Sequence, residues 1–202
     1  IIINKKLIEN NYENIIINTM EPIKTMRYLG NKTSHLPFIE EIINIYKEKH
    51  SLNSTLFDGF GGTGSITQYF NQKGFDVISN DINDYSFKLC YSRNNIALND
   101  LTFDGLEMNI SEVLEYLNNC KKKGFIYKNY SPNSSYKHER KYFTNDNAEI
   151  IDGIRSQIEE WFTTSKITEF EYIHLIGILI ETATLYSNIP GTYGAFSYTH
   201  LR

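Results

Sequence analysis

The chain has 202 residues and a formal net charge of −4, and 41% of its residues are hydrophobic. This composition excludes an intrinsically disordered chain, and the length fits one globular domain or one domain with a small insertion. The negative charge argues against a protein that coats nucleic acid, although one basic face would be enough for a DNA enzyme. Lys121–Lys123 and residues 137–141 are local concentrations of positive charge, which are also ordinary on a solvated surface.

Two cysteines, Cys90 and Cys120, are too few for a disulfide framework, and no cluster of Cys and His has the spacing of a zinc site. We therefore expect a reducing, cytoplasmic environment and no metal site. No uninterrupted apolar run approaches the roughly 20 residues of a membrane-spanning helix, and the start of the chain does not resemble a signal peptide. We expect no association with a membrane.

The predicted elements begin after a lead-in segment of undefined structure, residues 1–25. Apolar residues spaced at i, i+3, i+4 and i+7 from Ile39 to Tyr46 predict a helix that begins near Ser34. The next elements are expected in the order strand, glycine-rich turn, helix, strand and helix, at residues 52–58, 59–64, 65–72, 75–79 and 84–98. Strands that alternate with helices in this way indicate a parallel, doubly wound α/β sheet.

The second half of the chain is predicted to be mainly helical. Ser111 and Thr144 are the expected N-caps of two helices, and a third helix is predicted at 168–186. Short β-prone runs stand at 125–127 and 192–198. We therefore divide the chain into a lead-in, an α/β core and a mainly helical segment that inserts into or caps the sheet, at residues 1–25, 26–105 and 106–202.

The glycine-rich turn predicts a ligand site. Gly59, Gly61 and Gly64 have the G-x-G-x-x-G spacing between a strand and a helix. The free N–H groups at the start of such a helix attract a carboxylate or a phosphate. Asp81 ends the next strand, where its carboxylate can accept hydrogen bonds from both hydroxyls of a ribose. This arrangement predicts a nucleoside-containing cofactor.

Asp58 helps to choose between cofactors because it stands immediately before the glycines. A carboxylate there would repel the pyrophosphate of a nicotinamide or flavin dinucleotide, but it suits a cation. S-adenosylmethionine carries an ammonium, a sulfonium, a carboxylate and a ribose. Asp58 would attract the two cationic groups, the backbone N–H groups of residues 60–65 would bind the carboxylate, and Asp81 would accept hydrogen bonds from the ribose. The charge argument favours S-adenosylmethionine, and a dinucleotide-dependent oxidoreductase remains the alternative.

Three motifs resemble those of the Dam-like adenine-specific DNA methyltransferases. Residues 57–65 (FDGFGGTGS) resemble the F-x-G-x-G cofactor motif of this family, and residues 27–32 (RYLGNK) resemble its second cofactor motif, an aromatic residue followed by G-x-K. Residues 80–82 (NDI) resemble its ribose-binding strand end. Two later runs, at 139–144 and 191–196, look like segments of relatives in type II restriction–modification systems.

The resemblance implies a Rossmann-like class I methyltransferase core, with an incomplete sheet in this chain and a mainly helical recognition insertion. Together with the charge argument, it assigns the cofactor-binding residues as Tyr28, Lys32, Asp58, Phe60, Gly61, Gly62, Gly64, Ser65, Asp81 and Ile82. It assigns the binding of double-stranded DNA to Lys137, Arg140 and Tyr193. Each residue also has an ordinary interpretation; Asp81, for example, could cap the helix that follows it. The implied reaction moves a methyl group from S-adenosylmethionine to adenine N6.

The catalytic motif of the family, D-P-P-Y or a close variant, is not found in this sequence. It would hold the amino group of a flipped adenine, but none of the four prolines has a proline neighbour. We therefore assign no catalytic residue and expect the chain to be the amino-terminal part of a longer enzyme, inactive by itself. Two alternatives remain: a second polypeptide supplies the missing part, or the chain is a non-catalytic remnant that binds cofactor or DNA.

Overall fold

The computed structural model describes residues 32–94, 101–133 and 140–188. The predicted lead-in, the β-prone run at 192–198 and the last four residues of the helix predicted at 84–98 lie outside the described residues.

The α/β part is built around a short parallel sheet. Its elements are η1 (Thr33–His35), α2 (Leu36–His50), β1 (Thr55–Asp58), α3 (Ser65–Gln72), β2 (Asp76–Ser79) and α4 (Asp84–Asn94). β1 and β2 pair in parallel, with Phe57 opposite Ile78. The predicted order of strands and helices is confirmed, and α3 has the predicted bounds because glycines stand on both sides of it. The sheet formed by the described residues has two strands.

Much of the apolar surface of this part is uncovered by the described residues. Phe57 and Ile78, which oppose each other in the sheet, are 66% and 56% exposed. On α2, the helix predicted from apolar spacing is confirmed, but Ile42 and Tyr46 of its apolar stripe are exposed. Parallel sheets are normally covered on both faces. In the described part of the chain, these apolar side chains of the sheet and of α2 have no covering element.

The helical part has its own hydrophobic core. It contains η3 (Asp104–Leu106), α5 (Ile110–Asn118), α6 (Phe125–Tyr130), α7 (Asn145–Thr163) and α8 (Glu169–Leu185). Buried side chains of α5, α7 and α8 pack together with Leu101 and Phe103, around Trp161. Thr144 caps α7 as predicted, and Thr168 caps α8 in a capping box with Glu171. Within the described ranges, no helix is both long enough and apolar enough to cross a membrane.

Two sequence predictions in this part are wrong. The strand predicted at 125–127 is the first half of α6, because the carboxylate of Asp152 accepts hydrogen bonds from backbone N–H groups of residues 124, 126 and 127 and so caps a helix there. The N-cap of α5 is Asn109 rather than Ser111, because Asn109 forms a reciprocal capping box with Glu112.

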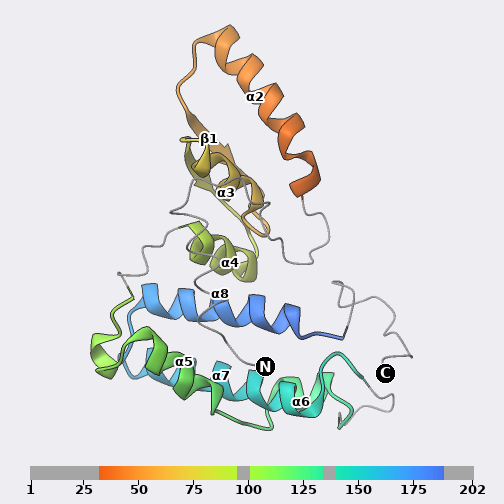
Figure 1. Ribbon diagram of the computed structural model, residues 1–202, viewed down its shortest axis with the longest axis vertical. Coiled ribbons are helices and arrows are strands. Elements are labelled where there is room, and N and C mark those ends of the chain that lie inside the picture. Colours follow the sequence, from red (N-terminus) through yellow and green to blue (C-terminus); the bar gives the residue numbers. More distant parts are fainter. Residues whose placement is uncertain (1–31, 95–100, 134–139, 189–202) are drawn as a thin grey trace.

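Helix α4 joins the two parts. In Figure 1 it lies between α3 and α8. A Cβ on Gly177 of α8 would lie 2.0 Å from Ser92 Oγ, so the two helices are in close contact at this point. Tyr91 of α4 adds an edge-to-face contact with Phe170 of α8, with ring centroids 6.4 Å apart. The α/β part is therefore packed on the helical part through α4.

Candidate functional site

Residues 59–64, called the glycine loop below, connect β1 to α3. Gly64 lies in the left-handed region with a φ of 75°, a conformation that favours glycine. A Cβ on Gly61 would lie 2.5 Å from Ser79 Oγ, and the Gly61 N–H donates to the Asn80 carbonyl at 2.9 Å. The loop therefore rests directly on the end of β2, where a side chain would not fit.

Asp58 lies at the carboxyl end of β1 and is only 8% exposed. Its carboxylate accepts hydrogen bonds from the Phe60 N–H at 3.3 Å and from Thr67 Oγ1 at 3.2 Å. Asp58 thus fixes the start of the glycine loop to the first turns of α3. It also places a negative charge beneath the loop.

Asp81 lies just beyond the end of β2, on the other side of the same loop. Its Oδ2 accepts a hydrogen bond from the Gly62 N–H at 2.8 Å, and its Oδ1 accepts one from the Asn83 N–H at 2.8 Å. A carboxylate offers about four acceptor positions, so two further hydrogen bonds remain available. The structure therefore brings Asp58 and Asp81 to the glycine loop from adjacent parallel strands.

The other predicted cofactor residues differ in their surroundings. The Ser65 hydroxyl is buried and shares a hydrogen bond of 2.8 Å with Thr63 Oγ1, inside the loop. Phe60 and Ile82 are fully accessible, with relative exposures of 86% and 103%. Lys32 is exposed just before η1, and Tyr28 lies outside the described residues. The exposed Phe60 of the loop and the exposed Ile82, which follows β2, are thus free to make apolar contacts.

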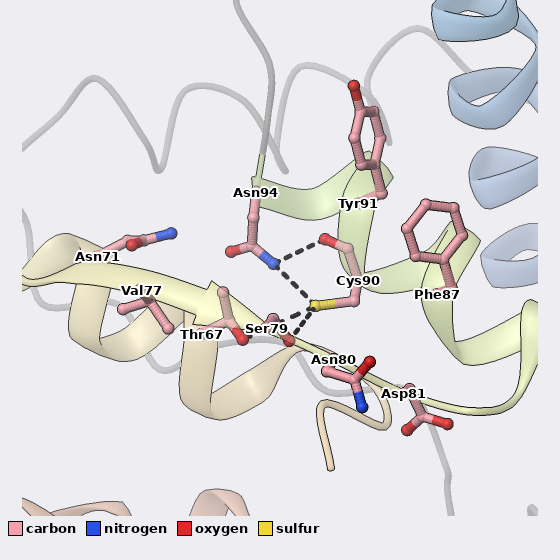
Figure 2. Close-up of a pocket in the computed structure, with 10 residues that line it drawn as sticks. All are labelled: Thr67, Asn71, Val77, Ser79, Asn80, Asp81, Phe87, Cys90, Tyr91 and Asn94. Carbon is pink, nitrogen blue, oxygen red and sulfur yellow. Dashed lines mark hydrogen bonds between the residues drawn. The ribbon is translucent and has the colours of Figure 1, made fainter. Parts of the chain in front are cut away.

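A pocket of about 110 Å³ lies between α3, β2 and α4 (Figure 2). Asp81 contributes to its lining, and among the predicted cofactor residues that the structure describes it is the one that does. Cys90 Sγ lies near the pocket floor, 3.2 Å from Ser79 Oγ and 3.6 Å from Asn94 Nδ2. Ser79, Asn80 and Asp81 make the lining polar at the end of β2.

Sequence analysis did not identify Cys90 and Asn94 as part of this site. They are four residues apart on α4, and both lie against Gly64: a Cβ there would be 3.2 Å from Cys90 Sγ and 3.0 Å from Asn94 Nδ2. Their i, i+4 spacing on one helix face was the available signal. Together they shape the surface on which the end of the loop rests.

Arg93 is a second residue that the sequence did not indicate. Its Nη1 donates to the Thr63 carbonyl at 2.7 Å, and its Nε forms an ion pair with Glu181 of α8. The two side chains are 11% and 13% exposed. Because these partners are 88 positions apart in the chain, no local pattern could have revealed the pair. Arg93 ties the glycine loop to the helical part.

Of the predicted DNA-binding residues, the structure describes Arg140, which lies apart from the glycine loop. The Arg140 guanidinium is 5.7 Å from the centre of the Tyr130 ring, at the end of α6. Figure 1 shows α6 on the opposite side of α8 from β1. Lys137 and Tyr193 lie outside the described residues. In the described part of the chain, no group of three or more His, Cys, Asp or Glu side chains is placed to hold a metal ion.

Comparison with known families gives a match over most of the chain. Residues 28–201 match the family model of the D12 class N6 adenine-specific DNA methyltransferases. The matched range includes every predicted cofactor-binding and DNA-binding residue. No solved structure matches the chain significantly.

Curated relatives are similar over 85% of this chain. Modification methylase LlaI from Lactococcus lactis subsp. lactis is 37% identical over 177 residues, and type II methyltransferase M.FokI from Planomicrobium okeanokoites is 38% identical over 180 residues. Type II methyltransferase M.NlaIII from Neisseria lactamica is 36% identical over 174 residues. The aligned regions cover 27%, 26% and 49% of these proteins, so the chain spans between about a quarter and a half of their lengths.

Proposed function

The chain belongs to the D12 class of N6 adenine-specific DNA methyltransferases, and on this premise we propose that its glycine loop binds S-adenosylmethionine. We further propose that it is the amino-terminal part of a longer enzyme that methylates adenine N6 in double-stranded DNA. The observation that carries the first proposal is the placement of Asp58 and Asp81 on either side of the loop, each hydrogen-bonded to a loop N–H.

The charges around the loop suit this cofactor better than a dinucleotide. The buried carboxylate of Asp58 would favour the ammonium and sulfonium of S-adenosylmethionine, whereas it would repel a pyrophosphate. Asp81 has acceptor positions left for the ribose hydroxyls. The residues around the loop therefore fit a cationic nucleoside.

The remaining assigned residues would complete the binding site. The exposed side chains of Phe60 and Ile82 offer apolar contact to the adenine ring of the cofactor. Tyr28 and Lys32 come before α2; Tyr28 would lie against the cofactor, and Lys32 would reach its carboxylate end. Bound S-adenosylmethionine supplies an electrophilic methyl group. The residues of this chain would position it and exclude water from it.

The catalytic step requires residues that this chain lacks. The sequence contains no double proline, so we propose that a D-P-P-Y-type motif follows in the longer protein. The exposed Phe57 and Ile78 support this proposal, because further strands and helices are needed to cover the sheet. The partial coverage of the relatives supports it too. Because these relatives are named as modification methylases or type II methyltransferases, we place the longer enzyme in a restriction–modification system.

A calorimetric titration tests the cofactor assignment. We expect the 202-residue chain to bind S-adenosylmethionine and not NADH. Asp81→Asn should weaken binding by about 1–3 kcal/mol, because charge-assisted hydrogen bonds are lost. The matched control is Asp76→Asn, which removes an exposed carboxylate at the start of the same strand and should leave the affinity unchanged. Equal binding by Asp81→Asn and the parent chain would show that the ribose lies elsewhere.

A methyl-transfer assay on mixed-sequence duplex DNA tests the second proposal. We expect no transfer by this chain alone and transfer to adenine N6 when the chain is expressed together with the coding sequence that follows it. Transfer by the chain alone would contradict the missing catalytic motif. No transfer by the extended protein, despite cofactor binding, would favour the non-catalytic alternative.

A further inference from the structure

Positive charge is concentrated in one stretch of this acidic chain. Seven of the 20 Lys and Arg residues, and one of the 24 Asp and Glu residues, lie between positions 121 and 144. This stretch therefore carries a formal charge of +6, whereas the rest of the chain carries −10. Such a local field can bind a polyanion even when the whole protein is acidic.

The fold brings the described cationic residues of this stretch to one region around α6. The Lys122 N–H donates to the Glu149 carbonyl at 2.9 Å, which fixes the first lysine run to α7. The Phe143 N–H donates to the Tyr130 carbonyl at 3.1 Å, which brings the second run to the end of α6. We call this region the α6 basic face; its described cations are Lys121, Lys122, Lys123, Lys128, Arg140 and Lys141.

Nearby carboxylates leave most of this positive charge uncompensated. Asp152 is 7% exposed and directs its carboxylate inward, to the N–H groups that begin α6. Glu149 lies 3.7 Å from Lys123, which is still 65% exposed. Within the described residues, Lys121, Lys122 and Lys128 are exposed and form no ion pair with a carboxylate.

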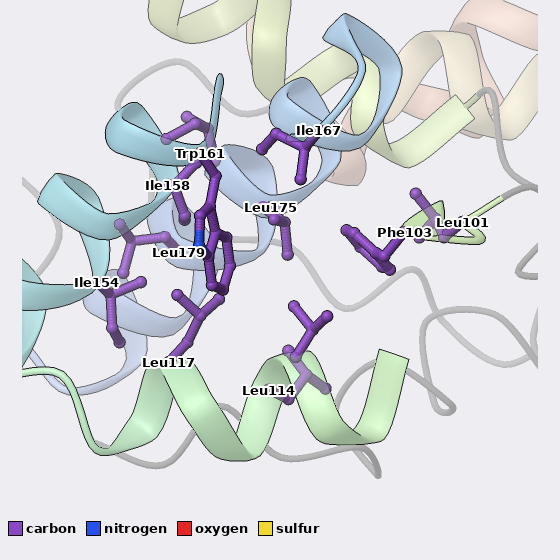
Figure 3. Packing of buried hydrophobic residues seen from close by; sticks show 12 residues of the cluster. Leu101, Phe103, Leu114, Leu117, Ile154, Ile158, Trp161, Ile167, Leu175 and Leu179 are labelled. Atoms are coloured by element: carbon purple, nitrogen blue, oxygen red, sulfur yellow. The ribbon is translucent and has the colours of Figure 1, made fainter. Parts of the chain in front are cut away.

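The α6 basic face also has a rigid support. The three hydrogen bonds from the start of α6 to Asp152 are 2.8–3.0 Å long. Gly124 allows the close approach, since a Cβ there would lie 2.8 Å from the Asp152 carboxylate. Helix α7, which carries Asp152, is anchored in the helical core by Ile154, Ile158 and Trp161 (Figure 3). The lysines are thus presented from a fixed backbone.

We infer that the α6 basic face binds the phosphate backbone of double-stranded DNA, with Lys121, Lys122 and Lys128 as contacts that add to Arg140. Exposed lysines act as point charges, so their contribution holds the duplex and does not select its sequence. This inference rests on the proposed function, because it names the surface on which the DNA of that reaction lies.

The test is the salt dependence of DNA binding by the 202-residue chain. Fluorescence anisotropy with a labelled mixed-sequence duplex gives the slope of log K against log salt concentration. Each lost phosphate contact should reduce that slope by about 0.9. Lys121→Gln/Lys122→Gln should therefore lower the slope by nearly 2 and weaken binding at low salt. A thermal melt of each variant checks that the fold is kept.

The matched control is Lys49→Gln/Lys166→Gln, which makes the same change in net charge at exposed positions away from α6. We expect this variant to keep the parent slope. Equal slopes for both double variants, or no DNA binding by the parent chain, would overturn the inference. Titration with S-adenosylmethionine keeps the two proposals separate. Both double variants should bind this cofactor as tightly as the parent chain does. If the parent chain does not bind it, the proposed cofactor site is wrong, and the proposed DNA surface is not affected.

Discussion

The bridge between the glycine loop and α8 gives a sharp prediction about stability. Replacing Arg93 by Met removes the guanidinium from Glu181 and from the Thr63 carbonyl, while the two charged side chains are only 11% and 13% exposed in the parent. Removal of one partner from a buried pair costs about 3–5 kcal/mol, because the remaining charge loses a partner that offset its desolvation. With the slight exposure of this pair, we expect a loss of about 3 kcal/mol in the free energy of unfolding.

Two further variants separate the ion pair from general packing. Arg93→Met/Glu181→Met replaces both charges by apolar groups, and it should recover all but about 1 kcal/mol of the loss. Arg155→Met breaks a pair in which Arg155 and Glu159 are 47% and 45% exposed, so it should cost less than about 1 kcal/mol.

Urea unfolding followed by circular dichroism and by tryptophan fluorescence measures these differences. The single tryptophan, Trp161, lies in the helical core, so its emission reports on the half of the molecule that holds Glu181. The reasoning would be refuted if Arg93→Met cost no more than Arg155→Met. It would also be refuted if the double variant were as unstable as Arg93→Met.

Two more predictions concern packing and pH. Gly177→Ala should destabilise the fold by about 1–3 kcal/mol in urea unfolding, because the added Cβ would lie 2.0 Å from Ser92 Oγ. This overpacking outweighs the higher helix propensity of Ala. A more stable variant would contradict the close contact. The hydrogen bond from Tyr69 and the ion pair with Lys73 lower the pKa of Glu40 below 4.5. That carboxylate therefore contributes stability above pH 4.5 that is lost as the pH falls through its lowered pKa. Tyr69→Phe should lower the melting temperature at pH 7, and this difference should shrink as the pH is lowered through the pKa of Glu40. A difference that stays constant as the pH is lowered would rule out the linkage.

Local patterns predicted the strand–loop–helix unit well. Glycines on both sides of residues 65–72 mark the bounds of α3, and the short β-prone runs before and after it became β1 and β2. The capping box that begins α5 was also readable, since Asn109 and Glu112 have the required spacing. Ser111 lacks this spacing, because the residue three positions later is Leu114.

Long-range contacts account for what the sequence did not reveal. The run Phe125-Ile126-Tyr127 has β-prone side chains, yet it is helical because Asp152, at least 25 positions away, caps it. The spacing of apolar residues predicted α2 as a helix, but spacing does not say what covers each residue.

In the candidate site too, local patterns predicted some residues, and long-range contacts determined the others. The glycines, Asp58 and Asp81 were found because a strand, a turn and the next strand lie close in sequence. Their binding of the cofactor stays a prediction. Arg93 was not found because its partner is on a distant helix. The family assignment removes the reason to consider a dinucleotide-dependent oxidoreductase.

The contact between Asp81 and the Gly62 N–H, at 2.8 Å, acts as an internal latch. It closes the loop with groups of the chain itself, so the entropy of ordering residues 59–64 is lost during folding and not at the moment of association. If the proposed cofactor binds there, it would not have to order the loop, and more of its contact energy would appear as affinity.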